Sequence, residues 1–564
     1  MTECASRPPL HLLGGGRSRP QETGPGEVGS KAFQLMRLDR LGLRVPPAVV
    51  VSTELCRRYH AEGGRLPEDF ASELARGVSR LEEVAGARLG DRRRPLLVAV
   101  RSGAPVSMPG MMDTLLNVGL NDESVRGLVR ATGDPHLAWD SYRRLVQAYA
   151  ELHGAPAAPF RQALDEYLDD AAREPRELDA HALREVTKAN LRLCAQLTGE
   201  PFPQQPLAQL RAAVEIVLRS WCSARAMAYR HLSGLSDDIG TAVMIQSMVF
   251  GNAGAQSGSG VGFTRDPATG ERRLYVDFLF DAQGEDVVSG RHAVENASRL
   301  AARLPGVHAE LVRVADVLER ELGDMQDFEF TVQGGVLYLL QARNGKRTPW
   351  AALRIALDLV DEGIIGRAEA LERLEQVDLD AIERVELAAP PGVAPVASAT
   401  PASHGIAVGR IALDLKRARE LAPGGPVLLV RESTSTEDID GIALAEGILT
   451  RTGGRTSHAA VVARQLGKVC LVGCRALRID LDARTLRIGD LGLTEGDVLT
   501  LDGQGGDVYA SELPVRRERP RAALERVFAW RAGGSEREAG VPPGAGLALP
   551  PVDAREGDGM VMGW

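Results

Sequence analysis

The 564-residue sequence is poor in cysteine and in long apolar stretches. Its six cysteines are scattered, which is typical of reduced cytosolic thiols rather than of a disulfide framework. No run of about 18 apolar residues occurs, so we expect no membrane-spanning helix. The first residues also lack the apolar core of a secretory signal peptide. These absences predict a cytoplasmic protein that does not associate with membranes.

Lysine is scarce as well. Five lysines stand against 62 arginines, which we attribute to GC-rich codon usage rather than to function. The net charge of −9 argues against a nucleic-acid-binding surface, so we expect no nucleic-acid partner. Any phosphate-binding site must therefore be locally positive on an acidic molecule.

The pattern of apolar residues divides the chain into several units. At about 150 residues per domain, the length suggests roughly three or four of them. Buried strands such as "AVVV" and "DFEFTVQGG" alternate with helical three/four spacing, and a stretch rich in Ala and Pro separates two compact regions. We expect the following organisation: a loose segment, 1–27; a mixed α/β unit, 28–348, with a helical part at about 122–229; helices and a hinge-like linker, 349–402; a second compact unit, 403–513; a helix and a disordered tail, 514–564.

One histidine lies at the start of a helix-patterned run, in "GILTRTGGRTSHAAVVARQLG". Thr456 or Ser457 is a natural N-cap, which places His458 in the first helical turn beside free backbone N–H groups. The positive helix end favours a neutral, nucleophilic imidazole and would stabilise a phosphoryl group on it, and Arg455 adds a cation. The residues alone leave two interpretations open: a phosphoryl acceptor, or an ordinary surface histidine at a helix start.

The same segment resembles the phosphohistidine segment of the pyruvate, phosphate dikinase family, and related segments occur in phosphoenolpyruvate synthase and in enzyme I of the sugar phosphotransferase system. Four upstream stretches resemble that family's nucleotide-binding segments: 98–122, 237–271, 281–290 and 324–348. The resemblance covers roughly residues 28–513. It implies a multidomain α/β (α+β) protein, in which an ATP-grasp domain with a helical insertion is followed by a swivelling β/β/α phosphohistidine domain.

The resemblance also implies roles for individual residues. His458 would be the catalytic phosphoryl carrier, with Arg455, Thr456 and Ser457 beside it. The residues expected to bind nucleotide or phosphate are Lys31, Arg101, Gly110, Thr114, Gln246, Asp277, Gln283, Gln341 and Arg343. Asp277 stands where the family is expected to have glutamate, which keeps the charge but shortens the reach.

A metal site is expected at Asp327 and Glu329. The two residues flank Phe328, so both side chains point to one face of a strand, and paired carboxylates suit Mg²⁺. Gln341 and Arg343 repeat that spacing on the next strand. Taken singly, an Asp-x-Glu pair is more often a solvated strand face, and "GSGVGF" is a weak signal that usually marks a turn.

The family's reaction implies two steps here. A pyrophosphoryl group moves from the substrate ATP to His458 and releases AMP, and inorganic phosphate, or water instead, then takes the terminal phosphoryl group. The family's pyruvate/PEP-binding barrel needs about 250 residues. Only residues 514–564 follow the second unit, and their Gly/Pro-rich composition suggests a natural end, so we expect a separate acceptor protein that carries the barrel.

Two alternatives stay open: an acceptor of a different kind, as in antibiotic phosphotransferases, or a nucleotide-sensing regulator without catalysis. Thr456 occupies the position of a regulatory phosphothreonine in plant dikinases, but an N-cap role is the simpler interpretation. The sequence leaves the oligomeric state open, a homodimer included.

Overall fold

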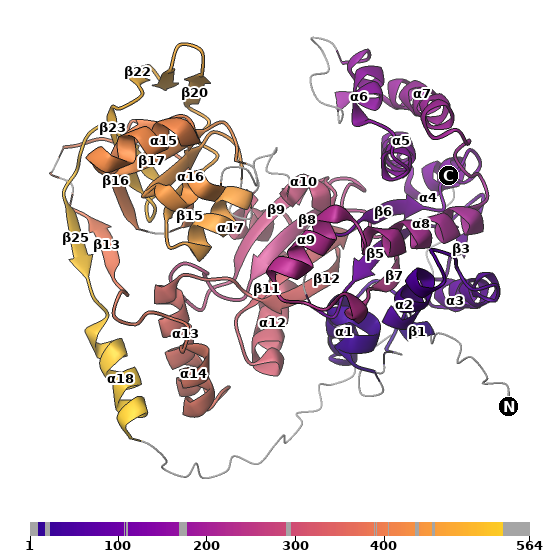
Figure 1. Ribbon diagram of the computed structural model, residues 1–564, viewed down its shortest axis with the longest axis horizontal. Coiled ribbons are helices and arrows are strands. Elements are labelled where there is room, and N and C mark those ends of the chain that lie inside the picture. The colour runs from indigo at the N-terminus through magenta and orange to yellow at the C-terminus, as the bar shows by residue number, and fades with distance from the viewer. Residues whose placement is uncertain are drawn as a thin grey trace. The chain divides into compact units, whose positions relative to one another are not determined.

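The computed structural model describes residues 10–16, 18, 23–106, 108, 111–168, 177–288, 295–388, 390, 392–403, 405–434, 439–453 and 457–533 (Figure 1). Among these residues, those up to Pro520 form one compact unit, and those from Arg521 onward form a second. The second unit contains helix α18 (Arg521–Ala532), which the sequence predicts. The expected tail beyond residue 533 lies outside the described residues.

The first sheet is antiparallel, with the order β1-β2-β7-β5-β6. Its strands are β1 (Leu10–Leu13), β2 (Ala48–Val51), β7 (Ala242–Ser247), β5 (Val98–Gly103) and β6 (Thr114–Val118). Strand β1 lies in the segment expected to be loose, and it is ordered because it pairs with β2 from Leu10↔Val51 to Leu13↔Ala48. Helix α1 (Pro25–Arg40) starts earlier than expected and is kinked at Gly29. Helices α2 (Thr53–Ala61) and α3 (Phe70–Ala85) follow β2.

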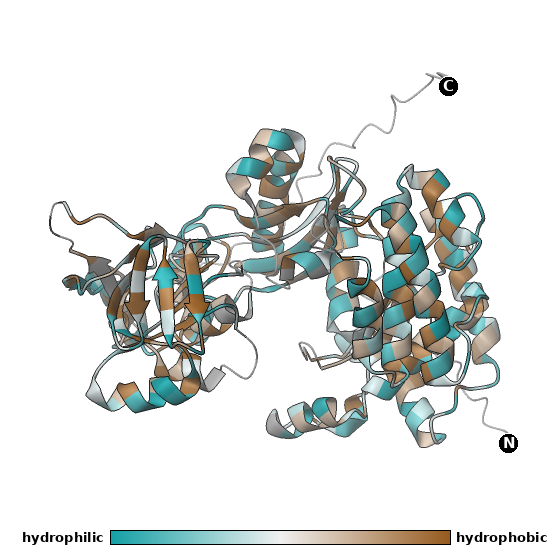
Figure 2. Cartoon of the chain, turned by 90° about the horizontal axis from the view of Figure 1, so that it is seen from above, coloured by the Kyte–Doolittle hydropathy of each residue, from teal (hydrophilic) through white to brown (hydrophobic). Residues whose placement is uncertain are grey.

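The predicted helical region is confirmed. It consists of α4 (Ser124–Thr132), α5 (Pro135–Leu152), α6 (Ala157–Asp165), α7 (Ala180–Thr198), α8 (Pro206–Ser220) and α9 (Ala224–Leu232). Asp134 and Asp179 cap α5 and α7 by accepting a backbone N–H at the third position. Hydrophilic and hydrophobic residues alternate along these helices (Figure 2), and the apolar faces share a core with the first sheet. Among the described helices, none is long and apolar enough to span a membrane.

The second sheet is also antiparallel, with the order β10-β9-β8-β11-β12. Its strands are β10 (Glu295–Asn296), β9 (Tyr275–Phe280), β8 (Gly258–Phe263), β11 (Gln326–Gln333) and β12 (Val336–Asn344). The "GSGVGF" stretch forms strand β8, in agreement with the strand pattern of this part of the sequence. A Cβ at Gly260 would lie 2.6 Å from Cζ of Phe330, and one at Gly262 would lie 2.4 Å from Cζ of Phe328. These glycines therefore make room for aromatic rings in the core that both five-stranded sheets share.

Helices cover this second sheet and lead away from it. They are α10 (Gly284–Val288), α11 (Ala297–Arg303), α12 (Pro305–Leu322), α13 (Pro349–Asp361) and α14 (Arg367–Arg373). Strand β13 (Arg384–Leu387) then pairs antiparallel with β25 (Val515–Glu518). The segments that enter and leave the next domain therefore run side by side in one ribbon.

The remaining domain is built on an eight-stranded sheet with the order β14-β24-β23-β16-β17-β18-β19-β15. Its strands are β14 (Ala397–Ser398), β15 (Thr400–Ser403), β16 (Ile406–Ala412), β17 (Val427–Arg431), β18 (Gly447–Thr450), β19 (Val469–Val472), β23 (Val498–Asp502) and β24 (Asp507–Tyr509). Strands β16 to β19 are parallel. Strands β14 and β15 lie within the segment expected to be linker. The small sheet of β20 (Leu477–Asp480), β21 (Thr485–Ile488) and β22 (Leu491–Thr494) was not predicted.

Candidate active site

Five of the predicted site residues share one face of the second sheet. Strand register places Arg343 opposite Asp327, and Gln341 opposite Glu329. On the other side of β8, Asp277 and Glu329 both pair with Val261. Side chains directly opposite each other in a sheet lie on the same face, so Gln341, Glu329 and Asp277 form one row and Arg343 and Asp327 form part of the next. The sheet thus assembles two carboxylates, a third carboxylate two strands away, a guanidinium and an amide.

The other face of the same strands explains why this arrangement is rigid. Phe328 and Phe330 alternate with the polar residues of β11 and are buried in the core shared by the two sheets. A β-bulge between Glu329 and Phe330 shifts the register with β12. Bulges re-aim side chains and increase local twist, and they occur often beside active sites.

Asp327 is buried and in contact with Arg343. The Nε and Nη2 atoms of Arg343 both lie 2.9 Å from Oδ2 of Asp327, whereas the buried Oδ1 has no hydrogen-bond partner among the described residues. Burial raises the pKa of Asp327, and the guanidinium of Arg343 only partly offsets that effect. A buried carboxylate oxygen without a donor beside a second carboxylate fits a divalent cation, so Asp327 and Glu329 suit Mg²⁺.

Lys31 belongs to the same electrostatic cluster. Its pKa is lowered to about 8, mainly by burial and further by the neighbouring charges of Arg101 and Arg343, while Glu329 opposes them. These interactions bring together helix α1, strand β5 of the first sheet and strands β11 and β12 of the second. The structure thus places Lys31 near two of the other predicted phosphate-binding cations, Arg101 and Arg343.

The first sheet contributes Arg101, Gln246 and Thr114. Arg101 lies opposite Thr114 of β6 and opposite Met244 of β7. Its Nη1 donates to Oε1 of the buried Gln246 at 3.5 Å. The three residues therefore share one face of this sheet. Gly110, expected in the phosphate-covering loop that precedes Thr114, lies outside the described residues.

Gln283 lies just beyond the end of β9, the strand that carries Asp277. Its backbone N–H donates to Oδ2 of Asp286 at 3.0 Å, and its Nε2 lies 3.4 Å from Oδ1 of Asn252. Asp277 itself is buried. No described contact joins Gln283 to the cluster around Asp327, so its role in nucleotide binding stays a prediction.

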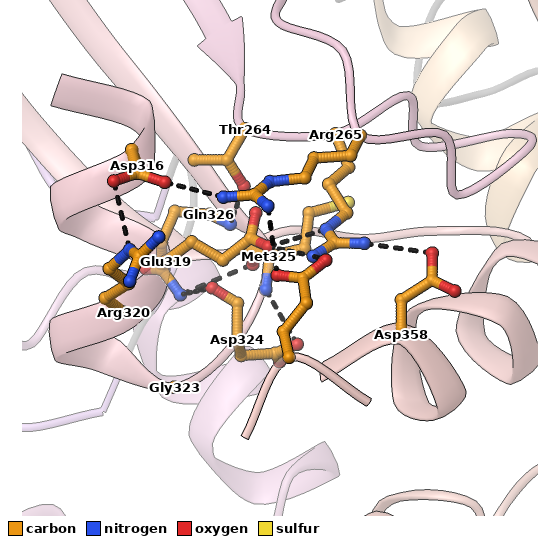
Figure 3. A network of polar contacts seen from close by, with 12 residues as sticks. Thr264, Arg265, Asp316, Glu319, Arg320, Gly323, Asp324, Met325, Gln326 and Asp358 are labelled. Atoms are coloured by element: carbon orange, nitrogen blue, oxygen red, sulfur yellow. Dashed lines mark hydrogen bonds and ion pairs between the residues drawn. The ribbon is translucent and has the colours of Figure 1, made fainter. Parts of the chain in front are cut away.

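A buried polar network holds the start of β11 beside Asp327 (Figure 3). The backbone N–H of Gln326 donates to Oγ1 of Thr264, and the backbone N–H of Thr264 donates to the carbonyl oxygen of Gln326, each at 3.0 Å. The fully buried Arg265 forms ion pairs with Glu319 of α12 and with Asp358 of α13. This network fixes β8 and β11 against two helices, so the carboxylate-bearing strand has little freedom to shift.

Sequence reasoning missed one cation in this cluster, Lys346. Burial and the charge of Arg343 lower its pKa, and Asp327 opposes them. The signal was present in the sequence: lysine is rare in this chain, and Lys346 lies three residues beyond Arg343. Two of the five lysines therefore belong to one electrostatic cluster.

The predicted position of His458 in the first turn of a helix is confirmed. Helix α17 (His458–Gln465) connects the parallel strands β18 and β19, and it begins beyond the carboxyl end of β18. This is the edge of a parallel sheet at which ligands usually bind. Gly453 approaches the start of this helix closely: it has φ +110°, and a Cβ there would lie 3.2 Å from Oγ of Ser457.

Ser457 occupies the N-cap position of α17, with φ −62° and ψ 161°. Its side chain makes no capping hydrogen bond, and its buried Oγ has no partner within the described part of the chain. Arg455 and Thr456 lie outside the described residues, so their predicted roles stay predictions.

Two family models match the chain. The pyruvate phosphate dikinase, AMP/ATP-binding domain, matches residues 64–307. The PEP-utilising enzyme, mobile domain, matches residues 424–506. The two matches fall on the part that holds the paired five-stranded sheets and on the part that holds the eight-stranded sheet, respectively.

Several pyruvate, phosphate dikinases are similar over most of the chain. That of Clostridium symbiosum is 42% identical over 511 residues, which is 89% of this chain and 58% of the relative. That of Rhizobium meliloti (strain 1021) is 40% identical over 539 residues, or 92% of this chain and 60% of the relative. The chloroplastic pyruvate, phosphate dikinase 1 of Arabidopsis thaliana is 41% identical over 526 residues, or 92% and 54%. The chain spans little more than half the length of these relatives.

The expected fold class is confirmed: a mixed α/β multidomain protein with an ATP-grasp-like nucleotide-binding domain and a mobile phosphohistidine domain. The chain carries phosphotransferase domains of the pyruvate, phosphate dikinase family, namely its AMP/ATP-binding domain and the mobile domain of PEP-utilising enzymes.

Proposed function

We propose that this chain is an ATP-dependent phosphotransferase that phosphorylates its own His458. The nitrogen of the imidazole attacks the β-phosphorus of ATP, and the bridging oxygen leaves with AMP. Inorganic phosphate then attacks the terminal phosphorus and takes that phosphoryl group away as pyrophosphate. The β-phosphoryl group stays on His458. The observation that supports this proposal best is the row of Asp277, Glu329 and Gln341 beside the Asp327–Arg343 pair on one sheet face.

The charges of the cluster suit a polyphosphate. Lys31, Arg101 and Arg343 supply positive charge for phosphate oxygens from three different elements. Asp327 and Glu329 would hold Mg²⁺, which when bound neutralises charge on the polyphosphate. Gln341 and Gln246 add neutral donors. Phosphoryl transfer needs mainly positioning and charge compensation, and these side chains provide both.

His458 is suited to carry the phosphoryl group because it begins a helix. The first backbone N–H groups of α17 lack intrahelical partners and can donate to phosphoryl oxygens. Ser457 adds a hydroxyl without a described partner at the same end. The carrier group and its anion-binding surroundings thus come from one short loop and one helix end.

Labelling with ATP that carries radioactive phosphorus at the β-position tests this proposal. Wild-type protein with Mg²⁺ and phosphate should become labelled, and the label should be acid-labile and alkali-stable. His458→Ala should remove the label, and His181→Ala, an exposed histidine on α7, should retain it. Label that persists in His458→Ala would contradict the mechanism.

The acceptor of the phosphoryl group is proposed to be pyruvate, bound by a barrel on a separate protein. This rests on the pyruvate, phosphate dikinases that match the chain. Exchange of label between phosphate and pyrophosphate, in the presence of ATP and AMP, should need only the described domains. Formation of phosphoenolpyruvate should need the added barrel protein, so its formation by the 564-residue chain alone would refute the proposed acceptor arrangement.

A further inference from the structure

Helix α1 is interrupted at a single glycine. Gly29 has φ +78° and ψ 157°, far from helical values, between a first turn at residues 25–28 and a helix from residue 30 to residue 40. Residues with a side chain rarely adopt a φ of this sign, and glycine does so without steric cost. Lys31 is the second residue beyond this break.

The break lets two backbones meet. A Cβ added at Gly29 would lie 1.8 Å from the carbonyl oxygen of Gly103 and 2.5 Å from its carbonyl carbon. The next residue secures the contact: the backbone N–H and the hydroxyl of Ser30 both donate to the carbonyl oxygen of Ala104, at 3.0 Å each. Helix α1 is therefore docked on the end of strand β5 through backbone atoms.

The segment is also held from its other side. Oγ1 of Thr53 donates to the carbonyl oxygen of Gly26 at 2.8 Å. Nε2 of His11 lies 3.1 Å from Oε1 of Glu27. A side chain at Gly29 could therefore be accommodated only if these bonds broke or if the helix moved away from β5.

Each of the two glycines in this contact lies two residues from a predicted phosphate-binding cation. Lys31 lies two residues after Gly29, and Arg101 lies two residues before Gly103. We propose that Gly29 is a positioning residue for ATP: its backbone contact with Gly103 sets the separation of Lys31 and Arg101, so that both cations reach the same polyphosphate. The inference rests on the proposed function. It gives Gly29, which has no charged side chain, an indirect role in phosphate binding.

The charged groups that surround Lys31 support this geometry. Arg101 of β5, Glu329 of β11 and Arg343 of β12 all interact with the Lys31 ammonium group, which is half-buried. Two guanidinium groups repel that ammonium group in the free protein, and the Glu329 carboxylate attracts it. The backbone contact at Gly29 helps to hold Lys31 beside the two guanidinium groups, and a polyphosphate would remove the repulsion.

The experiment measures binding of Mg²⁺ and α,β-methylene-ATP, whose α–β bridge cannot be cleaved, to full-length variants. Gly29→Ala should weaken binding about 10- to 100-fold, the effect of losing one charge-assisted contact. Gly103→Ala is the matched control, because a Cβ there meets nothing closer than 3.7 Å and its φ is ordinary. It should bind within about twofold of wild type, as should Gly26→Ala, which has open space.

A double-mutant cycle separates positioning from general damage. In the Lys31→Met background, Gly29→Ala should have little further effect, because the group that it positions is already absent. If the two effects multiply instead, or if Gly29→Ala binds like wild type, the positioning role is refuted. Equal losses in Gly103→Ala and Gly29→Ala would also overturn it. Failure of wild-type protein to bind the analogue would instead refute the proposed function.

Ser30→Ala keeps the test valid if Gly29→Ala does not fold. It removes one of the two bonds to the Ala104 carbonyl and introduces no clash. We expect binding about fivefold weaker, the effect of one neutral hydrogen bond, and no further loss in the Lys31→Met background. Unchanged binding by folded Ser30→Ala would count against the proposal.

Discussion

Asp327→Asn should abolish function while leaving the fold intact. The substitution keeps the size and shape of the side chain but removes the negative charge opposite Arg343. The buried Oδ1 of Asp327 has no described hydrogen-bond partner, so the free protein gains little from it. We therefore expect the loss to fall on the bound state, where the carboxylate would face Mg²⁺ and phosphates.

The effect on stability can be bounded from the structure. The folded protein raises the pKa of Asp327 through burial, so it favours the protonated form more than the unfolded chain does, and the ionised carboxylate costs stability at pH 7. Removing the charge relieves that cost. The lost ion pair offsets the gain only partly, because Arg343 is 47% exposed and such pairs contribute about 0–1 kcal/mol. The free energy of unfolding should therefore change by less than about 1 kcal/mol.

Asp324→Asn is the matched control and should behave in the opposite way. Asp324 lies three residues earlier in the buried network of Figure 3, and its two oxygens each accept from Arg347 at 2.6 Å. Arg373 lies 3.4 Å away. Removing this charge leaves the largely buried Arg347 guanidinium without its carboxylate, which costs about 3–5 kcal/mol for a buried pair, whereas Arg373 keeps Glu369. No described contact joins the Asp324 side chain to the five site residues on the face of the second sheet, so folded Asp324→Asn should still be labelled.

The assay combines thermal unfolding with single-turnover labelling from β-labelled ATP. Asp327→Asn should retain its melting temperature within a few degrees and label at least about 100-fold more slowly, the typical cost of one preorganised electrostatic group. Asp324→Asn should lose stability but label at a normal rate below its melting temperature. If Asp327→Asn lost many degrees and labelled in proportion to its folded fraction, Asp327 would be a structural residue and the metal site would be misassigned.

Two further predictions concern the linker and Lys31. Proteinase K should cut first between β13 and β14, where residues 392–395 are exposed, whereas β14 and β15 should be protected by the sheet; first cuts inside β14 or β15 would contradict this. Lys31→Met should raise the melting temperature at pH 7, because folding lowers the pKa of Lys31 from 10.5 to about 8 and so disfavours its charged form. That advantage should shrink as pH rises through 8 and vanish near 10.5, and a difference that is constant with pH would refute the assignment.

The parts that the sequence predicted well are those with strong local patterns. The strand at Gln326–Gln333 alternates apolar and polar residues, and this alternation alone predicts that Asp327 and Glu329 share one face. The helix start at His458 followed from cap residues and a glycine stop. Both depend on periodicities of one element, which a single sequence can reveal.

The parts that the sequence could not predict depend on pairing between distant segments. The row that joins Asp277 to Glu329 exists only because both strands flank β8. The Gly and Pro content of the first residues predicts a loose segment, whereas strand β1 is ordered by its pairing with β2. The strand pattern of β8 was visible, but the reason for its glycines was not, because it lies in phenyl rings on neighbouring strands. Each of these features arises from tertiary contacts that override local signals.

The scarcity of lysine makes Lys31 informative in one more way. Arginine occupies almost every basic position of this chain, so a lysine at the centre of the candidate site calls for a physical reason. Arg101 and Arg343 already crowd this half-buried space, and an ammonium group is compact, whereas a third guanidinium is larger, planar and always charged. Lys31→Arg should therefore weaken nucleotide binding although the charge is unchanged. Lys188→Arg, on the exposed surface of α7 where lysine pairs only with Glu185 in a described contact, should have no effect. Equal affinity of Lys31→Arg and wild type for Mg²⁺ and α,β-methylene-ATP would show that charge alone matters at this position and that the spacing set by Gly29 is looser than the backbone contact implies.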